Sequence, residues 1–269
     1  MQIEWQRLNE EGILWQEGGQ MTHLLIDQGR WLDIQKFLYE CLEQPEFALL
    51  FATTHHQPLL DASPLLVLLP ADESAREQLI SETSQRCAGV GLRSDLSLVE
   101  SATHFRAFLT VPDGAGESYL RFYDPAILAA LWLSKMCSAL GRGVDQWWLP
   151  DWGKAGWRVF SSSTTGNDMA PRITPELEEH AMFVRLLYLL PPQSFVHHAW
   201  LALCTMQVIK GGLTEHWEWY PWYQALARQL DNLPAIWPGL TGDLVSRSDP
   251  DEALAELLNE PLVIEKAVC

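Results

Sequence analysis

The sequence predicts an α+β fold, in which an N-terminal lobe with a small mixed β-sheet flanked by helices precedes a mainly α-helical C-terminal lobe. In the first half of the 269-residue chain, short apolar runs alternate with helix-like periodicity, whereas beyond Thr174 the patterns are helical. A stretch rich in Trp, Gly and Ser separates the two. We therefore expect an α+β lobe over residues 1–140, an irregular connection over 141–169 and a helical lobe over 170–269.

Strands and helices are expected in turn along the first part of the chain. Apolar runs predict strands at 23–27, 47–52, 65–69 and 89–92. Apolar residues at helical spacing predict a helix over Trp31–Cys41, and an amphipathic pattern predicts another over Glu73–Arg86. The run 65–69 is apolar on both of its faces, which is typical of a central strand covered on both sides.

A hairpin and a sharp corner follow. Runs at 106–111 and 118–123 flank a short loop that contains Asp113-Gly114, which is a hairpin signal. The second run leads directly into Asp124-Pro125. A carboxylate can cap a helix, and proline suits the first helical position, so a helix is expected over Pro125–Met136.

The last part of the chain predicts helices separated by Pro and Gly. They are expected over Glu176–Leu190, 194–209 and Pro221–Leu230, with a further helix that begins after Asp249-Pro250 and ends near Leu258.

The charge excludes some classes of partner. The chain has 35 Asp and Glu against 18 Lys and Arg, a net charge of −17. Such a surface repels phosphate backbones and anionic lipids, so neither nucleic acid nor membrane is expected as a partner. The start of the chain lacks the pattern of a secretory signal, and the 5 cysteines form no CxxC pair. We expect a cytoplasmic protein.

The sequence contains no familiar catalytic motif. It has neither HExxH nor G-x-S-x-G, and His55-His56 and His197-His198 are neighbours whose side chains are expected to point in different directions. We therefore expect no metal, no cofactor and no catalytic residue. Asp27, Asp61 and Asp124 follow or end expected strands, where carboxylates could converge around a cation or could instead cap backbone amides.

Two groups of residues are candidates for binding or for structure. An aromatic cluster surrounds Pro221 and is either a partner-binding surface or a wedge between helices; it comprises Trp217, Trp219, Tyr220, Trp222 and Tyr223. Arg106 and Arg121, on the two arms of the expected hairpin, are expected to pair with internal carboxylates and to fix the corner.

The segment Leu120–Leu128 (LRFYDPAIL) resembles the "FRFYDPRVL" signature of the bacterial type VI secretion adaptor, or effector chaperone, family, first catalogued as a domain of unknown function. Residues 24–29 (LLIDQG), 60–67 (LDASPLLV), 91–94 (GLRS) and 104–106 (HFR) resemble further motifs of that family in the same order. The resemblance covers residues 22–135. Ala126 stands where the family usually has Arg, which puts a partner contact of that Arg in doubt.

This resemblance implies a non-catalytic cytoplasmic adaptor that binds a toxic effector and loads it onto the VgrG spike. The N-terminal lobe would then engage the spike, and the helical lobe would bind the effector. Scaffold roles are expected for the motif residues, which are Asp27, Asp61, Ser63, Pro64, Arg106, Arg121, Phe122, Tyr123, Asp124 and Pro125. The alternatives are an acidic immunity protein that neutralises a toxin directly and a metal-dependent enzyme that uses the three aspartates.

Overall fold

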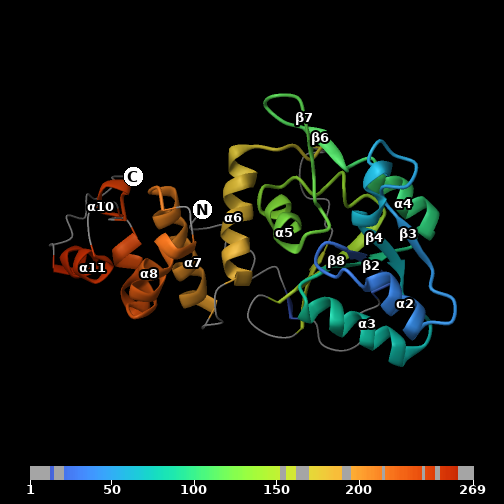
Figure 1. The fold of residues 1–269 in the computed structure, drawn as a ribbon, viewed down its shortest axis with the longest axis horizontal. Helices are drawn as coiled ribbons and strands as arrows, with labels where there is room; N and C mark the ends of the chain where they lie inside the picture. The colour runs from blue at the N-terminus through green and yellow to red at the C-terminus, as the bar shows by residue number, and fades with distance from the viewer. Residues whose placement is uncertain are drawn as a thin grey trace. The chain divides into compact units, whose positions relative to one another are not determined.

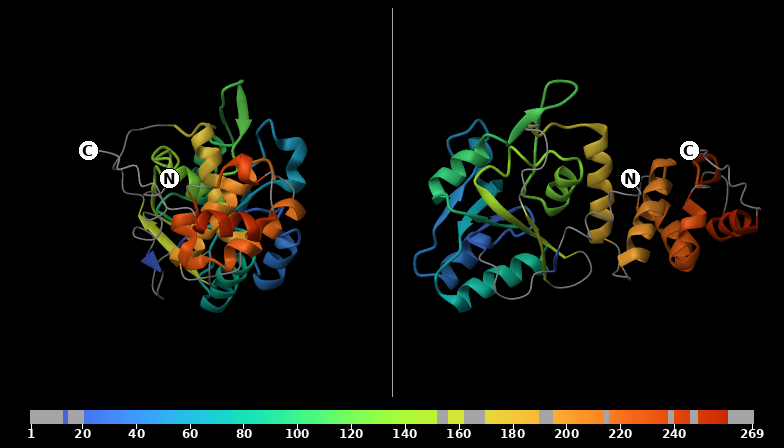
Figure 2. Two further views of the ribbon diagram at one scale, coloured as in Figure 1. Left: turned by 90° about the vertical axis from the view of Figure 1, so that its left-hand side faces the viewer. Right: turned by 180° about the vertical axis from the view of Figure 1, so that it is seen from behind.

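The chain divides into two compact units, Met1–Val184 and Arg185–Cys269 (Figures 1 and 2). The computed structural model describes residues 13–14, 21–151, 156–161, 170–189, 195–213, 216–237, 240–245 and 249–259. The predicted α+β class is confirmed, because the first unit contains sheet and helices and the described residues of the second are mostly helical. The division falls inside α6 (Pro175–Leu189), later than the expected start of the helical lobe at residue 170.

The main sheet of the first unit has seven strands, and every adjacent pair is antiparallel. Its order is β1-β9-β8-β5-β2-β4-β3. The strands are β1 (Ile13–Leu14), β2 (His23–Ile26), β3 (Phe47–Leu49), β4 (Leu65–Leu68), β5 (Gly89–Ser94), β8 (Val144–Pro150) and β9 (Trp157–Ser161). The prediction of a mixed sheet is wrong, because an apolar run shows that a strand is buried but not which way it runs.

Strands β8 and β9 lie in the range that was expected to be an irregular connection, so that expectation is wrong for them. Trp147 and Trp148 pair with Leu92 and Gly91 of β5. Aromatic residues favour strands, and here they outweigh the glycines on which the irregular assignment depended.

Helices cover both faces of this sheet (Figure 1). On one face, α2 (Ile34–Cys41) and α3 (Glu73–Gln85) contribute to a buried cluster with strand residues such as Leu24 and Val67. On the other, the ring of Phe105 in α4 (Leu98–Arg106) lies 6.0 Å from that of Trp147, and the ring of Trp132 in α5 (Pro125–Leu133) lies 5.3 Å from that of Phe160. Coverage on both sides explains why β4 is apolar throughout and why β2 is apolar after His23.

Helix α4 was missed by the sequence analysis, which placed a strand at 106–111. Ser97 accepts a hydrogen bond from the backbone N–H of Glu100, and the Glu100 carboxylate accepts one from the Ser97 N–H. This capping box starts the helix, which ends at Arg106. The predicted hairpin is confirmed in a shorter form, β6 (Thr110–Pro112) and β7 (Glu117–Tyr119), and projects from the first unit (Figure 1).

The second unit is helical in its described residues. After the end of α6 it contains α7 (Phe195–Lys210), α8 (His216–Ala227), the 3₁₀ turn η2 (Leu230–Asn232), α9 (Leu233–Ile236), α10 (Gly242–Val245) and α11 (Pro250–Asn259). Helix α8 begins before the predicted Pro221, which lies inside it. None of the helices within the described ranges is long and apolar enough to cross a membrane.

Candidate functional site

Asp27 follows β2 and lies at a buried corner of the first unit. Its backbone N–H donates to the carbonyl of Ala88 at 2.7 Å, which continues the pairing of β2 with β5. The strands approach closely here, since a Cβ on Gly89 would lie 2.1 Å from the carbonyl oxygen of Leu25. The Asp27 carboxylate turns back to accept from the N–H of Gly29 at 3.0 Å. The glycine at 89 therefore allows β2 and β5 to approach closely just before Asp27.

Asp124 lies at the same corner, although it is distant from Asp27 in the sequence. It caps α5 as predicted, because its Oδ1 accepts from the N–H of Ala126 at 2.9 Å, and Pro125 occupies the first turn. Asp27 and Asp124 are both almost completely buried. A buried carboxylate is costly unless it is paired and hydrogen-bonded.

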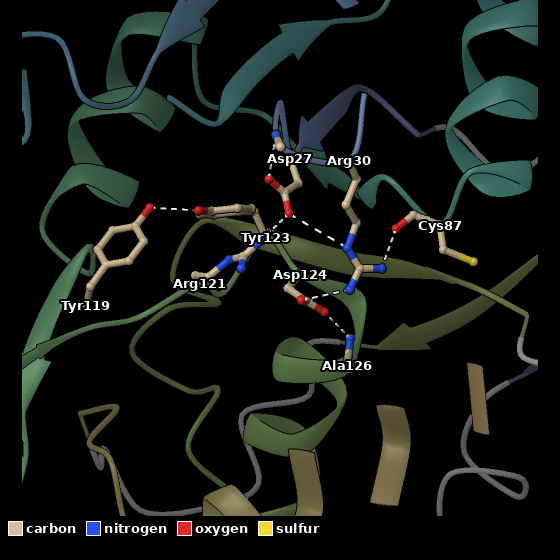
Figure 3. A network of polar contacts seen from close by, with 9 residues as sticks. Asp27, Arg30, Cys87, Tyr119, Arg121, Tyr123, Asp124 and Ala126 are labelled. Carbon is tan, nitrogen blue, oxygen red and sulfur yellow. Dashed lines mark hydrogen bonds and ion pairs between the residues drawn. The ribbon is translucent and has the colours of Figure 1, made fainter. Parts of the chain in front are cut away.

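Two arginines neutralise these carboxylates (Figure 3). Arg121 donates from Nη2 to Oδ2 of Asp27 at 2.5 Å. Arg30 donates from Nη2 to Oδ2 of Asp124 at 3.0 Å and places Nε 3.8 Å from Oδ2 of Asp27. We call Asp27, Arg30, Arg121, Tyr123 and Asp124 the corner network. It joins the end of β2 to the start of α5.

Arg30 was not identified from the sequence. Its Nη1 also donates to the carbonyl of Cys87 at 3.0 Å, so one guanidinium contacts three segments (Figure 3). A basic residue three positions after Asp27 was the available signal, but nothing local indicated that its main partner would be Asp124. The expected pairing of Arg121 with an internal carboxylate is present.

Tyrosines extend the corner network toward the hairpin. The hydroxyls of Tyr119 and Tyr123 lie 2.7 Å apart, and the guanidinium of Arg121 lies 5.9 Å from the ring centre of Tyr123. Burial raises the pKa of both tyrosines, so both stay protonated at neutral pH. Phe122, which lies between the two tyrosines in the sequence, is fully buried. The predicted motif residues 121–125 thus all lie at this corner, where the side chain of Arg121 borders solvent and the other four residues are buried.

The three candidate aspartates do not converge. Asp61 is exposed in the 3₁₀ turn η1 (Gln57–Ala62), and it is its backbone carbonyl that accepts from Nε2 of Gln28 at 2.7 Å. Asp27 and Asp124 are both engaged by arginines. Among the described residues, no group of three or more His, Cys, Asp or Glu is placed to hold a metal ion.

Ser63, Pro64 and Arg106 form a separate structural arrangement at the edge strand β3. Leu50 donates its N–H to the carbonyl of Pro64 at 3.0 Å, but proline has no N–H to return to the carbonyl of Leu50. Arg106 supplies that donor from Nε at 3.2 Å, and its Nη2 donates to the carbonyl of Leu49 at 3.0 Å. Buried Ser63 accepts from the N–H of Phe51 at 2.9 Å. Arg106 therefore binds backbone carbonyls of the sheet edge rather than a carboxylate, and the expected ion pair is wrong.

The aromatic cluster of α8 is mostly buried. Trp219, Trp222 and Tyr223 are 6%, 3% and 7% exposed, whereas Tyr220 is 39% exposed and stacks on Tyr223 with ring centres 5.6 Å apart. The side chain of Trp217 lies outside the described residues. These values favour the wedge between helices for three members and leave the Tyr220 ring accessible to a partner.

The adjacent histidines His55 and His56 lie together, contrary to expectation. Their ring centres are 3.8 Å apart, and Nε2 of each lies 3.2 Å from the hydroxyl of Thr110 in β6. The His56 ring also contacts that of Tyr119, with centres 5.0 Å apart. Burial and the nearby charge of His55 lower the pKa of His56. This pair attaches the base of the hairpin to the first unit.

Comparison with known families covers the same region. Residues 22–139 match the family model described as "Domain of unknown function (DUF4123)". This region is a DUF4123 domain. No curated protein and no solved structure matches the chain. The DUF4123 domain runs from just before β2 to just beyond α5, so it contains the entire corner network, the hairpin and Arg106, whereas β8, β9 and the second unit lie outside it.

Proposed function

We propose that this chain is a non-catalytic cytoplasmic adaptor that binds a toxic effector and loads it onto the VgrG spike of a bacterial type VI secretion system. The observation that carries the proposal is the DUF4123 domain at residues 22–139, in which the LRFYDPAIL segment and the other motifs resemble those of the adaptor family. The spike and the effector are the expected partners.

The chemistry of the corner network supports a scaffold. Acid–base catalysis needs a carboxylate that can exchange protons with a substrate. Here Asp27 and Asp124 are buried and already bonded to Arg121, Arg30 and backbone amides. The two arginine bonds join segments 94 residues apart in sequence, and the two amide bonds hold local turns in place, which is the role of groups that maintain a fold.

The surface of the first unit carries exposed apolar side chains that could contact a partner protein. Several large apolar side chains are exposed there, namely Leu32 (79%), Tyr39 (65%), Leu59 (59%) and Val99 (73%). The net charge of −17 favours basic partner surfaces over acidic ones. A basic toxin is therefore a suitable cargo on electrostatic grounds.

The test is co-purification of the tagged full chain from cells that also produce the neighbouring candidate effector and spike protein. We expect both partners to be recovered and the effector to be lost from cells without this chain. The matched variants are Tyr220→Ala, which alters an exposed ring, and Gln224→Ala, an exposed residue of the same helix, as the control. Effector recovery that falls only with Tyr220→Ala would assign that ring to the effector interface.

Other outcomes favour the alternatives. Recovery of the toxin without the spike, with protection of cells that have no secretion apparatus, would indicate an immunity protein. A stoichiometric divalent metal in the purified chain, lost on Asp27→Asn substitution, would indicate the metal-dependent enzyme. Recovery of neither partner would contradict the adaptor proposal.

A further inference from the structure

The β6–β7 hairpin has an outer edge whose backbone groups are not paired. Hydrogen bonds from Leu120 N to Leu109 O and from Asp113 N to Gly116 O, both 3.0 Å, define which residues face each other across the hairpin. In an antiparallel pair, hydrogen-bonded positions alternate with positions whose N–H and C=O groups point outward. The outward positions are Thr110 and Pro112 on β6 and Glu117 and Tyr119 on β7.

The two edges of the hairpin differ. On β6, the carbonyl of Pro112 already accepts from the N–H of Ile173 at 3.0 Å, and Pro112 has no N–H to donate. On β7, the backbone N–H and C=O groups of Glu117 and Tyr119 have no hydrogen-bond partner within the described part of the chain. Only β7 thus presents two donors and two acceptors in strand geometry.

The edge is held in place for binding. Both side-chain oxygens of Asp113 are bonded, Oδ1 to the N–H groups of Ala115 (2.7 Å) and Gly116 (2.6 Å) and Oδ2 to the hydroxyl of Ser118. The hydrogen bond from Ser118 lowers the pKa of Asp113, which therefore stays ionised. At the base, Tyr119 is held by its hydroxyl bond to Tyr123. A partner strand would lose little free energy in ordering this edge.

We propose that β7 binds an extended, basic segment of a partner protein by adding it as a third strand to the hairpin. Main-chain hydrogen bonds to Glu117 and Tyr119 would supply the affinity. The exposed carboxylate of Glu117, the ionised Asp113 and the net charge of −17 select Lys and Arg on the incoming strand. The same charge disfavours a second copy of this chain, which would bring Glu117 near its own equivalent. This proposal rests on the proposed adaptor function, because that function is the reason to expect a protein as the partner.

The test uses two synthetic peptides with the full chain: acetyl-Lys-Val-Lys-Val-Lys-Val-amide and the same sequence with Glu in place of Lys. Binding is followed by the chemical shifts and hydrogen exchange of the backbone amides. We expect the basic peptide to slow exchange at Glu117 and Tyr119, with an affinity that falls as salt is added. The acidic peptide should leave both amides unchanged. Equal binding of both peptides, or protection elsewhere with Glu117 and Tyr119 unaffected, would overturn the proposal.

A matched pair of variants separates backbone from charge. Glu117→Pro removes one outward N–H and keeps the hairpin hydrogen bonds, because Glu117 and the facing Pro112 form a pair that is not hydrogen-bonded across the hairpin. Glu117→Gln removes only the charge. We expect Glu117→Pro to weaken basic-peptide binding about tenfold and Glu117→Gln by about threefold. Equal affinities for both variants and the unmodified chain would contradict strand addition.

A self-association measurement completes the design. Sedimentation of the unmodified chain should show no dimer that depends on β7. A dimer that is lost in the Glu117→Pro variant would mean that β7 pairs with a second copy instead. If the effector and spike are recovered while the peptide leaves β7 unaffected, strand addition fails and the adaptor function stands. Peptide binding without recovery of either protein gives the reverse conclusion.

Discussion

The carboxylate of Asp27 and the guanidinium of Arg121 are 94 residues apart in sequence and 2.5 Å apart in space. Asp27 is 3% exposed, whereas the side chain of Arg121 is 44% exposed. The ion pair is therefore asymmetric: one end is inside the domain and the other borders solvent. Loss of Arg121 would leave a buried carboxylate whose nearest remaining cation is Arg30, at 3.8 Å.

This asymmetry predicts a non-additive pair of substitutions. Arg121→Ala should lower the free energy of unfolding by about 1–3 kcal/mol, because the buried side chain of Asp27 loses its closest partner. Adding Asp27→Asn to Arg121→Ala should cost less than the sum of the two single changes. Urea unfolding of the two single variants and the double variant measures the coupling. Strict additivity would show that the two side chains do not interact in solution.

A second prediction concerns Arg106 at the sheet edge. Arg106→Lys keeps the charge but cannot reproduce the two separate donors, Nε and Nη2, that bind the carbonyls of Leu50 and Leu49. We expect a loss of about 1–2 kcal/mol of stability, since buried acceptors lose a donor. Arg93→Lys is the control, because Arg93 pairs with half-exposed Asp145 across 3.6 Å. Its stability should change by less than about 0.5 kcal/mol. Equal effects of the two changes would contradict the edge role of Arg106.

The sequence was informative where local chemistry decides the structure. Asp124-Pro125 specifies a helix start by itself, and the apolar runs of β2 and β4 specify buried strands, so these elements lie close to the predicted positions. The Asp113-Gly114 turn likewise predicted the hairpin. In each case the determining residues lie within a few positions of one another.

The parts that were missed depend on contacts between distant residues. Nothing near Pro64 in sequence indicates that its missing N–H is compensated by Arg106, and nothing near Arg30 indicates a bond to Asp124. Nothing near Trp147 and Trp148 in sequence indicates that they pair with β5, so this strand was expected to be part of an irregular connection. The aromatic residues around Pro221 left both an interface and a wedge between helices open, because their burial depends on how α8 packs against its neighbours.

A third prediction separates core from surface in α8. Trp222 is 3% exposed, so Trp222→Ala should destabilise the second unit by about 3–5 kcal/mol through the cavity it leaves. Tyr220, at 39% exposed, should tolerate alanine with a loss below about 1 kcal/mol. Thermal unfolding followed by near-ultraviolet circular dichroism distinguishes them. A similar fall in Tm for both variants would mean that Tyr220 is also part of the core.

A last prediction concerns pH and His23, which lies in the middle of the sheet with its Nε2 buried and without a hydrogen-bond partner in the described structure. Burial lowers its pKa from the usual value of 6.5. The folded state therefore keeps His23 neutral at a pH where the unfolded chain already binds a proton. Linkage then requires the free energy of unfolding to be unaffected by this group above about pH 6.5 and to fall as the pH drops below it.

His23→Leu removes the titrating group and puts an apolar side chain in its place, so it should flatten this dependence between pH 7 and 5. Part of the slope should remain, since the pKa of His56 is lowered as well. The measurement is urea unfolding at a series of pH values, and an identical slope in the variant and the unmodified chain would exclude His23 as a source of acid sensitivity.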